Sequence, residues 1–492
     1  MKHILAFFCF SWLLFLLVTP SLGQPFKAVN LGAWLVSEGW MTPWLFDNIV
    51  NKDLLDGTQI QLKSTMLSQY VAAENGGGTN LLANRDNPSG WEIFTRVNDT
   101  FFNLKVFNKQ FVGKSNQGSN AVAVATTPGD TETFPIIRNG DDPSKVLLKA
   151  SSDQFLQAKS GSSVTIDYQG STDWSDQNPY IFKMSIVSSL SGEYQLTNGY
   201  GPDKAPQVIQ NHWNTYIKED DFIFMSQNGI NAVRIPVGWW IKYDQTPPKP
   251  FVGGSLQALD NDFNWAEKHN IKVIIDLHAV LGSQNGNDHS ATRDGSAEWG
   301  DSKIGETVEV IDFLTKRYAN RPGLVAIELM NEPHAQYVPL NTLIKYYQAG
   351  YDAVRKYNST AYVILSNRLG NAKNTELLSF AHGLPRSVID VHYYNLYSDE
   401  FNVQQNIDYI YNQRASTLGE ITQSNGPLTF VGEWVNEFAN GIKSNQDYQN
   451  FGKVQLDVYG RSTFGWAYWS YKCQYDHWSL RNMIEKGIIN LK

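Results

Sequence analysis

The chain has 492 residues, enough for a large barrel and a smaller unit. It carries 48 acidic against 40 basic residues, for a formal net charge of −8 and no basic run. This balance argues against a nucleic-acid-binding protein and against a protein held at a membrane surface by basic residues.

The N-terminus has the pattern of a secretory signal peptide. Lys2 precedes the apolar run Ile4–Val18, and the small residues Ser21–Gly23 follow it. The run is shorter than the roughly 20 residues that span a bilayer. We therefore expect residues 1–23 to be cleaved and the protein to be secreted, extracellular or in a cell wall, without a membrane anchor. Sequons compatible with N-glycosylation begin at Asn98 and Asn358.

Short apolar, β-rich runs recur along most of the chain. The first is Phe26–Trp34, and the others alternate with amphipathic helical stretches from residue 207 onward. The later runs are Asn231–Gly238, Lys272–Ala279, Val325–Pro333, Ala361–Arg368, Ser387–Asn395, Leu428–Val435 and Phe464–Tyr471. This alternation is typical of a parallel sheet covered by helices. We expect an α/β protein with a (β/α)8 TIM barrel formed by residues 24–56 and 191–492.

The segment 57–190 separates the first two barrel strands and contains an internal triplicate. Leu62, Leu104 and Leu148 recur at nearly equal intervals, and each unit closes on an aromatic residue, at Phe94, Phe134 and Phe182. Three units are too few for a propeller. We expect an inserted β-trefoil, and the pattern resembles the fascin-like trefoil. Its role is either carbohydrate targeting, for example to a cell-wall polysaccharide, or shaping of the barrel mouth.

Two glutamates follow apolar barrel strands in distinctive contexts. Glu332 lies in Asn331-Glu332-Pro333, and Glu433 lies in Gly432-Glu433-Trp434. A parallel barrel brings the C-terminal ends of distant strands to one mouth. Glycoside hydrolysis needs two carboxyl groups facing each other across one sugar. We therefore predict a retaining β-glycosidase with Glu332 and Glu433 as its catalytic pair.

Further polar and aromatic side chains lie at or near the same strand ends. They are Arg234, His278, Asn331, His392, Tyr394 and Trp469. Each alone is weak evidence, because a single histidine at a strand end is more often structural. Their occurrence on successive strands indicates one site. The histidines have no third ligand at metal-binding spacing, so we expect neither a metal nor a cofactor.

Several longer motifs accompany these residues. They are Asn30–Glu38, Met41–Phe46, His212-Trp213, Gly282–Gly286 and the Asn-Glu-Pro, His-Tyr-Tyr and Gly-Glu-Trp triplets. With them the chain resembles glycoside hydrolase family 5 of clan A, and most of all its exo-β-1,3-glucanase branch. A fascin-like insert in such a barrel resembles a subgroup found in plants.

The resemblance implies that Glu332 is the general acid/base and Glu433 the nucleophile, with carboxyl groups about 5–5.5 Å apart. It also implies that Arg234 lowers the pKa of Glu433, whereas Glu332 stays protonated at working pH. Tyr394 would hydrogen-bond Glu433, and Asn331 would bind the sugar 2-hydroxyl. The full set of implied substrate contacts is Glu38, Arg234, His278, Asn331, His392, Tyr394 and Trp469.

One segment departs from the exo-glucanase pattern. Asn287, Asp288 and His289 stand where that branch has a sugar-clamping aromatic residue and then Asp-Asn, although a later aromatic is kept as Tyr397. We then equally expect an exo-β-glucanase and a broader β-glucosidase that acts on short β-glucosides. In either case we expect a monomer. The alternatives are an endo-β-glucanase or β-mannanase, a transglycosylase with an acceptor site at Trp299 or Trp478, and a non-catalytic carbohydrate-binding protein.

Overall fold

A computed structural model describes residues 24–97, 102–170, 173–396, 401–439 and 443–492. The predicted signal peptide, the Asn98 sequon and Tyr397 lie outside these ranges. Within them, no helix has both the length and the apolar character needed to cross a membrane.

Eight parallel strands close into a barrel, which confirms the predicted (β/α)8 architecture. In barrel order they are β1 (Phe26–Asn30), β14 (Ala232–Gly238), β15 (Lys272–Ala279), β16 (Leu324–Glu328), β17 (Tyr362–Ser366), β18 (Ser387–Asn395), β19 (Leu428–Phe438) and β20 (Gly465–Tyr468). β1 pairs with both β14 and β20, so the strand that precedes the long insertion completes the barrel.

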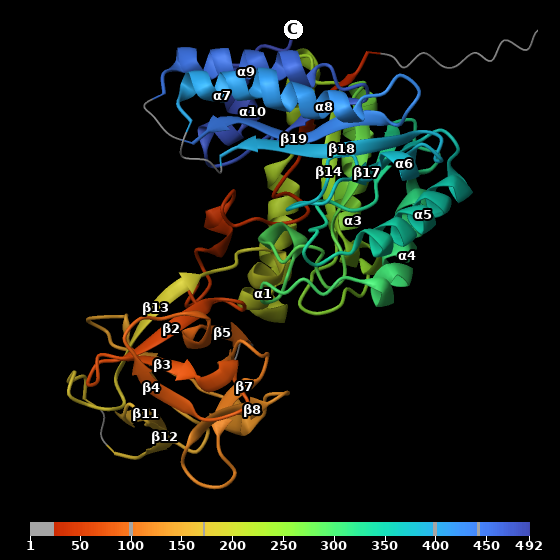
Figure 1. The fold of residues 1–492 in the computed structure, drawn as a ribbon. Helices are drawn as coiled ribbons and strands as arrows, with labels where there is room; N and C mark the ends of the chain where they lie inside the picture. Colours follow the sequence, from red (N-terminus) through yellow and green to blue (C-terminus); the bar gives the residue numbers. More distant parts are fainter. Residues whose placement is uncertain (1–23, 98–101, 171–172, 397–400, 440–442) are drawn as a thin grey trace, which may run out of the picture.

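Helices surround the barrel (Figure 1). They are α1 (Glu193–Tyr216), α2 (Glu219–Gln227), α3 (Ser255–Lys268), α4 (Ile304–Tyr318), α5 (Leu340–Tyr357), α6 (Leu378–Ala381), α7 (Val403–Tyr409), α8 (Ala415–Ile421), α9 (Asn445–Tyr459) and α10 (Leu480–Glu485). Outward-facing strand residues such as Val273, Ile275 and Leu277 share one hydrophobic core with residues of these helices. Strand side chains alternate between two faces, so every second residue points into the barrel.

The barrel interior changes character along its axis. An apolar layer that includes Ala28, Ala232, Ile274, Ala326, Ile364, Val388 and Phe430 fills one end. Two residues farther along each strand the side chains are mostly polar, with Asn30, Arg234, Asp276, Glu328, Ser366 and Asp390 all buried. The apolar layer seals the bottom of the barrel, and the polar layer lies beneath the mouth where the site forms.

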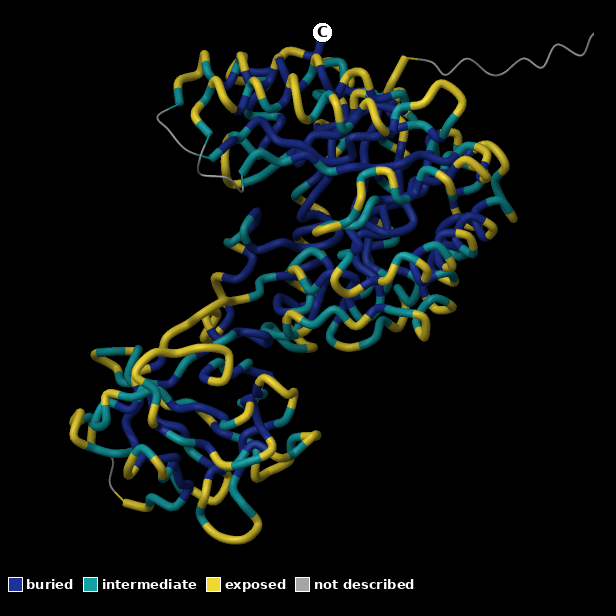
Figure 2. The backbone as a smooth tube through the Cα atoms, viewed as in Figure 1, coloured by how far each residue is buried: buried dark blue, intermediate teal, exposed yellow. Residues whose placement is uncertain are grey.

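The segment between β1 and β14 forms a separate β-rich unit that protrudes from the barrel (Figure 1). Its strands are β2 (Gln59–Ser64), β3 (Tyr70–Ala73), β4 (Leu81–Arg85), β5 (Phe94–Val97), β6 (Asn103–Lys105), β7 (Phe111–Lys114), β8 (Ala121–Ala125), β9 (Ile136–Arg138), β10 (Lys145–Leu148), β11 (Phe155–Ser160), β12 (Ser163–Tyr168) and β13 (Phe182–Ser188). The unit has its own buried core, to which Leu62, Leu104, Leu148, Phe94 and Phe134 belong (Figure 2).

Candidate active site

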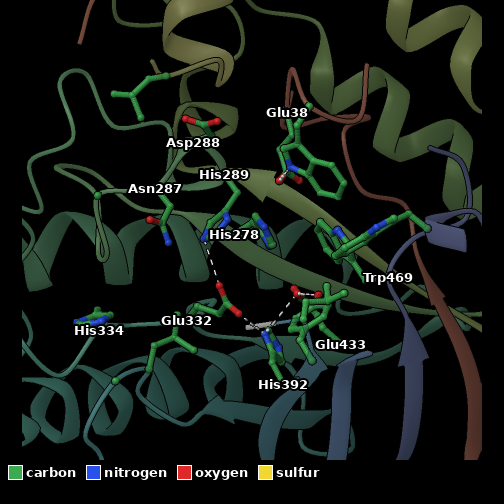
Figure 3. A pocket seen from close by; sticks show the side chains of 18 of the residues that line it. Glu38, His278, Asn287, Asp288, His289, Glu332, His334, His392, Glu433 and Trp469 are labelled. Carbon is green, nitrogen blue, oxygen red and sulfur yellow. Dashed lines mark hydrogen bonds and ion pairs between the residues drawn. The ribbon is translucent and has the colours of Figure 1, made fainter. Parts of the chain in front are cut away.

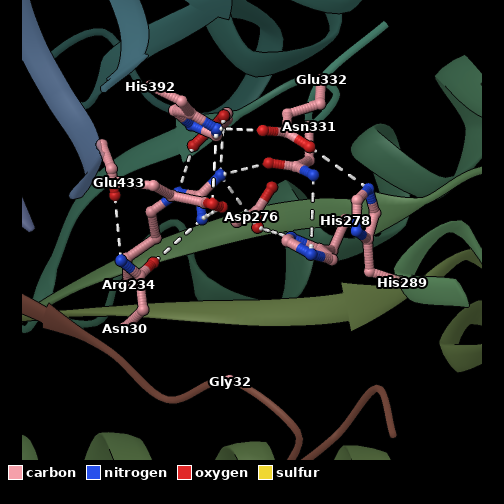
Figure 4. A network of polar contacts seen from close by, with 12 residues as sticks. Asn30, Gly32, Arg234, Asp276, His278, His289, Asn331, Glu332, His392 and Glu433 are labelled. Carbon is pink, nitrogen blue, oxygen red and sulfur yellow. Dashed lines mark hydrogen bonds and ion pairs between the residues drawn. The ribbon is translucent and has the colours of Figure 1, made fainter. Parts of the chain in front are cut away.

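A pocket of about 1070 Å³ opens at the C-terminal ends of the barrel strands (Figure 3). Seven of the residues predicted from the sequence line it: Glu38, His278, Glu332, His392, Tyr394, Glu433 and Trp469. The other two, Arg234 and Asn331, are fully buried and belong to the polar network beside the two glutamates (Figure 4). The tertiary structure therefore brings all nine residues into one region.

Glu332 lies beyond the strand that was expected to carry it, because β16 ends at Glu328. Its φ of 46° is in the left-handed region, which costs a non-glycine residue on the order of 1 kcal/mol or more. Two buried side chains hold this backbone: Ser366 Oγ accepts from the Glu332 N–H at 3.3 Å, and Asn285 Nδ2 donates to its carbonyl oxygen at 3.0 Å. The end of β17 and the loop after β15 thus hold Glu332 in a strained conformation, and its side chain lines the pocket.

Glu433 lies within β19 and is held by charged and polar partners. Arg234 Nη1 donates to Oε1 at 3.1 Å, and the Tyr394 hydroxyl donates to Oε2 at 2.6 Å. These two contacts were expected from the resemblance, and both form. They leave the carboxylate fixed in orientation with its charge compensated.

His392 connects the two glutamates. Its Nδ1 lies 2.7 Å from Glu332 Oε1 and 3.4 Å from Glu433 Oε2, while Nε2 lies 3.0 Å from Asp390 Oδ2. One carboxylate oxygen of each glutamate and a His392 ring nitrogen all lie within 4.8 Å of one another. Retaining glycosidases hold their carboxyl groups about 5–5.5 Å apart, whereas inverting ones need about 6.5–9.5 Å.

Arg234 joins the carboxylates of three strands. Besides Glu433, its guanidinium donates twice to Glu328, at 2.6 and 3.0 Å, and lies 3.2 Å from Asp276. Nη2 also donates to Asn331 Oδ1 at 2.9 Å. Asn331, which was expected to bind a sugar hydroxyl, therefore already engages the arginine in this structure.

Trp469 forms one wall of the pocket. Its ring stacks on His278, with centroids 5.4 Å apart and planes 9° from parallel. A Cβ atom on Gly32 would lie 2.9 Å from the Trp469 ring, so the small residue in the Asn30–Glu38 motif leaves room for the indole. This arrangement offers an aromatic face of the kind on which sugar rings stack.

The pKa directions differ from those expected. Burial raises the pKa of Glu433, and the nearby His392 and Arg234 charges reduce that rise without reversing it. Burial also raises the pKa of Glu332, but the hydrogen bond and charge of His392 outweigh it and lower the pKa. The pKa of His392 is lowered by burial but raised well above its usual value by the charges of Glu433 and Asp390. Carboxylates at both ring nitrogens therefore favour the protonated form of His392.

Two supporting aspartates were missed by the sequence analysis, although a local signal was present. Asp276 Oδ2 lies 2.6 Å from His278 Nδ1, and Asp390 Oδ2 lies 3.0 Å from His392 Nε2. Each aspartate stands two residues before its histidine, so strand alternation places both on the inward face. The repeated Asp-x-His pattern at two strand ends could have indicated them.

The predicted acceptor tryptophans differ in their placement. Trp478 lines the pocket and lies edge-to-face against Trp40, with centroids 4.9 Å apart. Trp299 is wrong as a pocket residue, because it is not among the residues that line this pocket and its indole N–H instead donates to Thr307 Oγ1 in the first turn of α4. Asp288 and His289, noted only as departures from the family pattern, both line the pocket.

Comparisons with known proteins agree with this geometry. Residues 198–474 match the model of the cellulase family (glycosyl hydrolase family 5), and residues 51–187 match a domain of unknown function, DUF7910. The chain is 31% identical over 346 residues to glucan 1,3-beta-glucosidase of Schwanniomyces occidentalis, covering 60% of this chain and 78% of the relative. It is 30% identical over 369 residues to the Pichia angusta enzyme of the same name, and the match covers 63% of this chain and 81% of that relative.

Among solved structures, the rutinosidase from Aspergillus niger matches the fold with a TM-score of 0.53 at 20% identity, covering 61% of this chain and 89% of that chain. The family match covers more than half of the chain, and the two glutamates lie at the mouth of its barrel. The chain therefore belongs to glycosyl hydrolase family 5 and is a glycoside hydrolase.

Proposed function

We propose that this protein is a secreted, retaining β-glycosidase that removes glucose from the non-reducing end of β-glucosides or β-gluco-oligosaccharides. The observation that carries the proposal is the placement of carboxylate oxygens of Glu332 and Glu433 within 4.8 Å of each other in one pocket. Carboxylate oxygens this close favour double displacement, whose carboxyl groups stand about 5–5.5 Å apart, over inversion, which needs about 6.5–9.5 Å. The names of the fungal relatives favour a β-1,3-linked glucan as substrate.

The reaction proceeds in two steps. Glu433 attacks the anomeric carbon and Glu332 protonates the departing oxygen, which forms a glycosyl-enzyme and releases the aglycone. Glu332 then takes a proton from water while the water oxygen attacks the anomeric carbon, which breaks the bond to Glu433 and releases the sugar with its β configuration retained. Arg234 and Tyr394 stabilise the Glu433 carboxylate when it leaves. His278, His392, Glu38 and Asn331 contact hydroxyl groups, and Trp469 supports the sugar ring.

We also propose that the β-rich insert is a fascin-like β-trefoil that holds the enzyme on a cell-wall polysaccharide. Support comes from its strand pattern: β2–β5, β6–β9 and β10–β13 are three successive sets of four, and equivalent strands carry Leu62, Leu104 and Leu148. The pattern at residues 1–23 supports secretion, and the Asn358 sequon supports glycosylation. The enzyme acts as a monomer.

The test is hydrolysis of p-nitrophenyl β-glycosides, laminari-oligosaccharides and cello-oligosaccharides, with the product anomer followed by NMR. We expect β-glucose as the first product from non-reducing ends. Glu433→Ala should lower kcat by roughly four orders of magnitude or more, whereas Glu437→Ala, on the same strand, should keep it. Initial release of α-glucose, or full activity of Glu433→Ala, would overturn the proposal.

A further inference from the structure

Asp390 is a fully buried side chain on β18, two residues before His392. Its Oδ1 accepts from the backbone N–H of Gly432 at 2.7 Å, and its Oδ2 lies 3.0 Å from His392 Nε2. A Cβ atom on Gly432 would lie 2.3 Å from Asp390 Oδ2, so this close approach of β19 requires a glycine before Glu433. Asp390 therefore contacts both the histidine and the strand that carries Glu433.

The ring of His392 has a carboxylate at each of its nitrogens. Nδ1 lies 2.7 Å from Glu332 Oε1 and 3.4 Å from Glu433 Oε2, on the opposite side of the ring from Asp390 (Figure 3). A neutral imidazole has only one N–H, so its other nitrogen would turn a lone pair towards a carboxylate oxygen. The doubly protonated ring donates at both nitrogens, and it places a positive charge between the two glutamates.

This charge acts on both glutamates. Burial raises the pKa of Glu332, but the hydrogen bond and charge of His392 outweigh burial and lower it. Burial also raises the pKa of Glu433, and the charge of His392 reduces that rise. Because the two carboxyl groups face the same cation, the two apparent pKa values of the pair rise or fall together with its charge.

Other titratable groups surround the histidine and the two glutamates. They are Glu38 after β1, Arg234 on β14, Asp276 and His278 on β15, Asp288 and His289 in the loop after β15, Glu328 on β16, Tyr347 on α5 and Tyr394 on β18. Arg234 contacts Glu433, whereas His392 contacts both glutamates. The charge of His392 is therefore the one whose loss changes both carboxyl groups at once.

We propose that Asp390 is a positioning residue that keeps His392 doubly protonated between the two glutamates and so places the working range of the enzyme at acidic pH. The inference rests on the proposed function. Asp390 is not among the residues that line the pocket, so it acts through His392. His392 keeps both of its protons during the reaction, and the proton that moves to the departing oxygen is the one on Glu332.

Asp390→Asn separates the charge of His392 from its hydrogen bond to Glu332. The Gly432 N–H can only donate, so the amide oxygen of the new side chain must face it and the amide nitrogen must face His392 Nε2. Nε2 then has to accept, which makes the ring neutral with its proton on Nδ1. That N–H still donates to Glu332. The charge of Asp390 is lost as well, but it lies farther from the glutamates than the ring does.

The first test compares the pH profile of kcat/KM for p-nitrophenyl β-glucoside in the full-length enzyme and in Asp390→Asn. Loss of a positive charge favours the protonated carboxyl groups, so both limbs of the profile should move up by about half to one pH unit. Asp221→Asn is the matched control. Asp221 is also buried and accepts from a backbone N–H, but its charged partners are Lys472 and Arg481, outside the pocket.

The control should leave both limbs in place. Limbs that stay fixed or move down in Asp390→Asn would overturn the inference, because a purely structural role would lower stability without moving them. Undiminished hydrolysis of an alkyl β-glucoside by Glu332→Gln would instead overturn the proposed function itself.

A second test needs neither catalysis nor a folded Asp390 variant. In ¹⁵N-histidine NMR of the unmodified enzyme at about pH 7.5, above the ordinary pKa of histidine, the His392 signal should be that of an imidazolium. Its loss in His392→Gln assigns the signal. In Asp390→Asn the same signal should become that of the neutral Nδ1–H tautomer. A neutral ring in the unmodified enzyme, or an imidazolium in the variant, would show that Asp390 does not hold the charge.

Discussion

At the scale of single residues, one buried guanidinium holds the polar layer of the barrel together. Arg234 is 0% exposed and contacts Asp276, Glu328 and Glu433 on three other strands. Its Nη1 also donates to Asn30 Oδ1 at 2.9 Å. A planar group with five N–H donors can make these contacts together, and a lysine ammonium cannot. The carboxylates of the site therefore depend on this side chain for charge compensation.

We predict that Arg234→Met lowers the free energy of unfolding by about 3–5 kcal/mol, because removing one partner of a buried ion pair leaves the remaining buried charge uncompensated. Chemical denaturation at pH 6 measures the change. Arg317→Met is the control: Arg317 binds Asp260 on the surface and is 39% exposed, so its replacement should cost less than about 1 kcal/mol. Equal losses in the two variants would contradict the role given to Arg234.

A second residue-scale prediction concerns Glu38, whose pKa is raised from 4.5 to about 8, chiefly by burial. Because the folded state holds this proton more tightly than the unfolded state, the associated stability is present below pH 4.5 and is lost as pH rises to about 8. Glu38→Gln removes that dependence. The stability of the variant relative to the natural protein should rise across this window by up to about 1.4 kcal/mol per pH unit. A difference that stays constant with pH would contradict it.

At the scale of elements, the chain that returns from the insert packs against the loop that carries Asp288 and His289. Ser191 donates to the Asp288 carboxylate through its N–H and its hydroxyl, both at 3.2 Å. Leu190, just before it, lines the pocket. A Cβ atom on Gly192 would lie 2.3 Å from the Asp288 carbonyl oxygen. The entry to α1 thus sets the position of one wall of the site.

We predict that Gly192→Ala displaces this loop and lowers kcat/KM at least tenfold, while overpacking lowers the free energy of unfolding by about 1–3 kcal/mol. Steady-state kinetics and denaturation of the same sample separate the two effects. Gly300→Ala provides the control, since a Cβ there meets nothing within 4 Å and the φ of −174° suits any residue. Unchanged kinetics in Gly192→Ala would show that the loop does not depend on this packing.

At the scale of the whole molecule, the insert is a second folding unit placed within the first. Its ends lie together, because Gln59 at the start of β2 pairs with Ser188 at the end of β13. Polar contacts join it to the barrel, such as the ion pair of Lys105 with Asp294. The core of the insert includes Leu54 and is separate from the barrel core.

We predict that residues 54–188 fold when expressed alone, with a β-type circular dichroism spectrum and one cooperative unfolding transition. Binding of this fragment to insoluble β-glucan, measured by co-sedimentation, would support a targeting role. A fragment without cooperative unfolding would show that the insert depends on the barrel.

The amino-acid sequence was enough to predict the eight barrel strands, the insertion between the first two, and the nine residues that the fold brings around one pocket. Strand period and strand-end chemistry are local properties, so they can be read without coordinates. Three features needed the folded structure: Asn331 engages Arg234, Trp299 does not line the pocket, and His392 reverses the expected pKa direction of Glu332. It also revealed the contact between His289 and Glu332. Protonation and hydrogen-bonding roles depend on distances between groups far apart in the chain, and no local pattern encodes those distances.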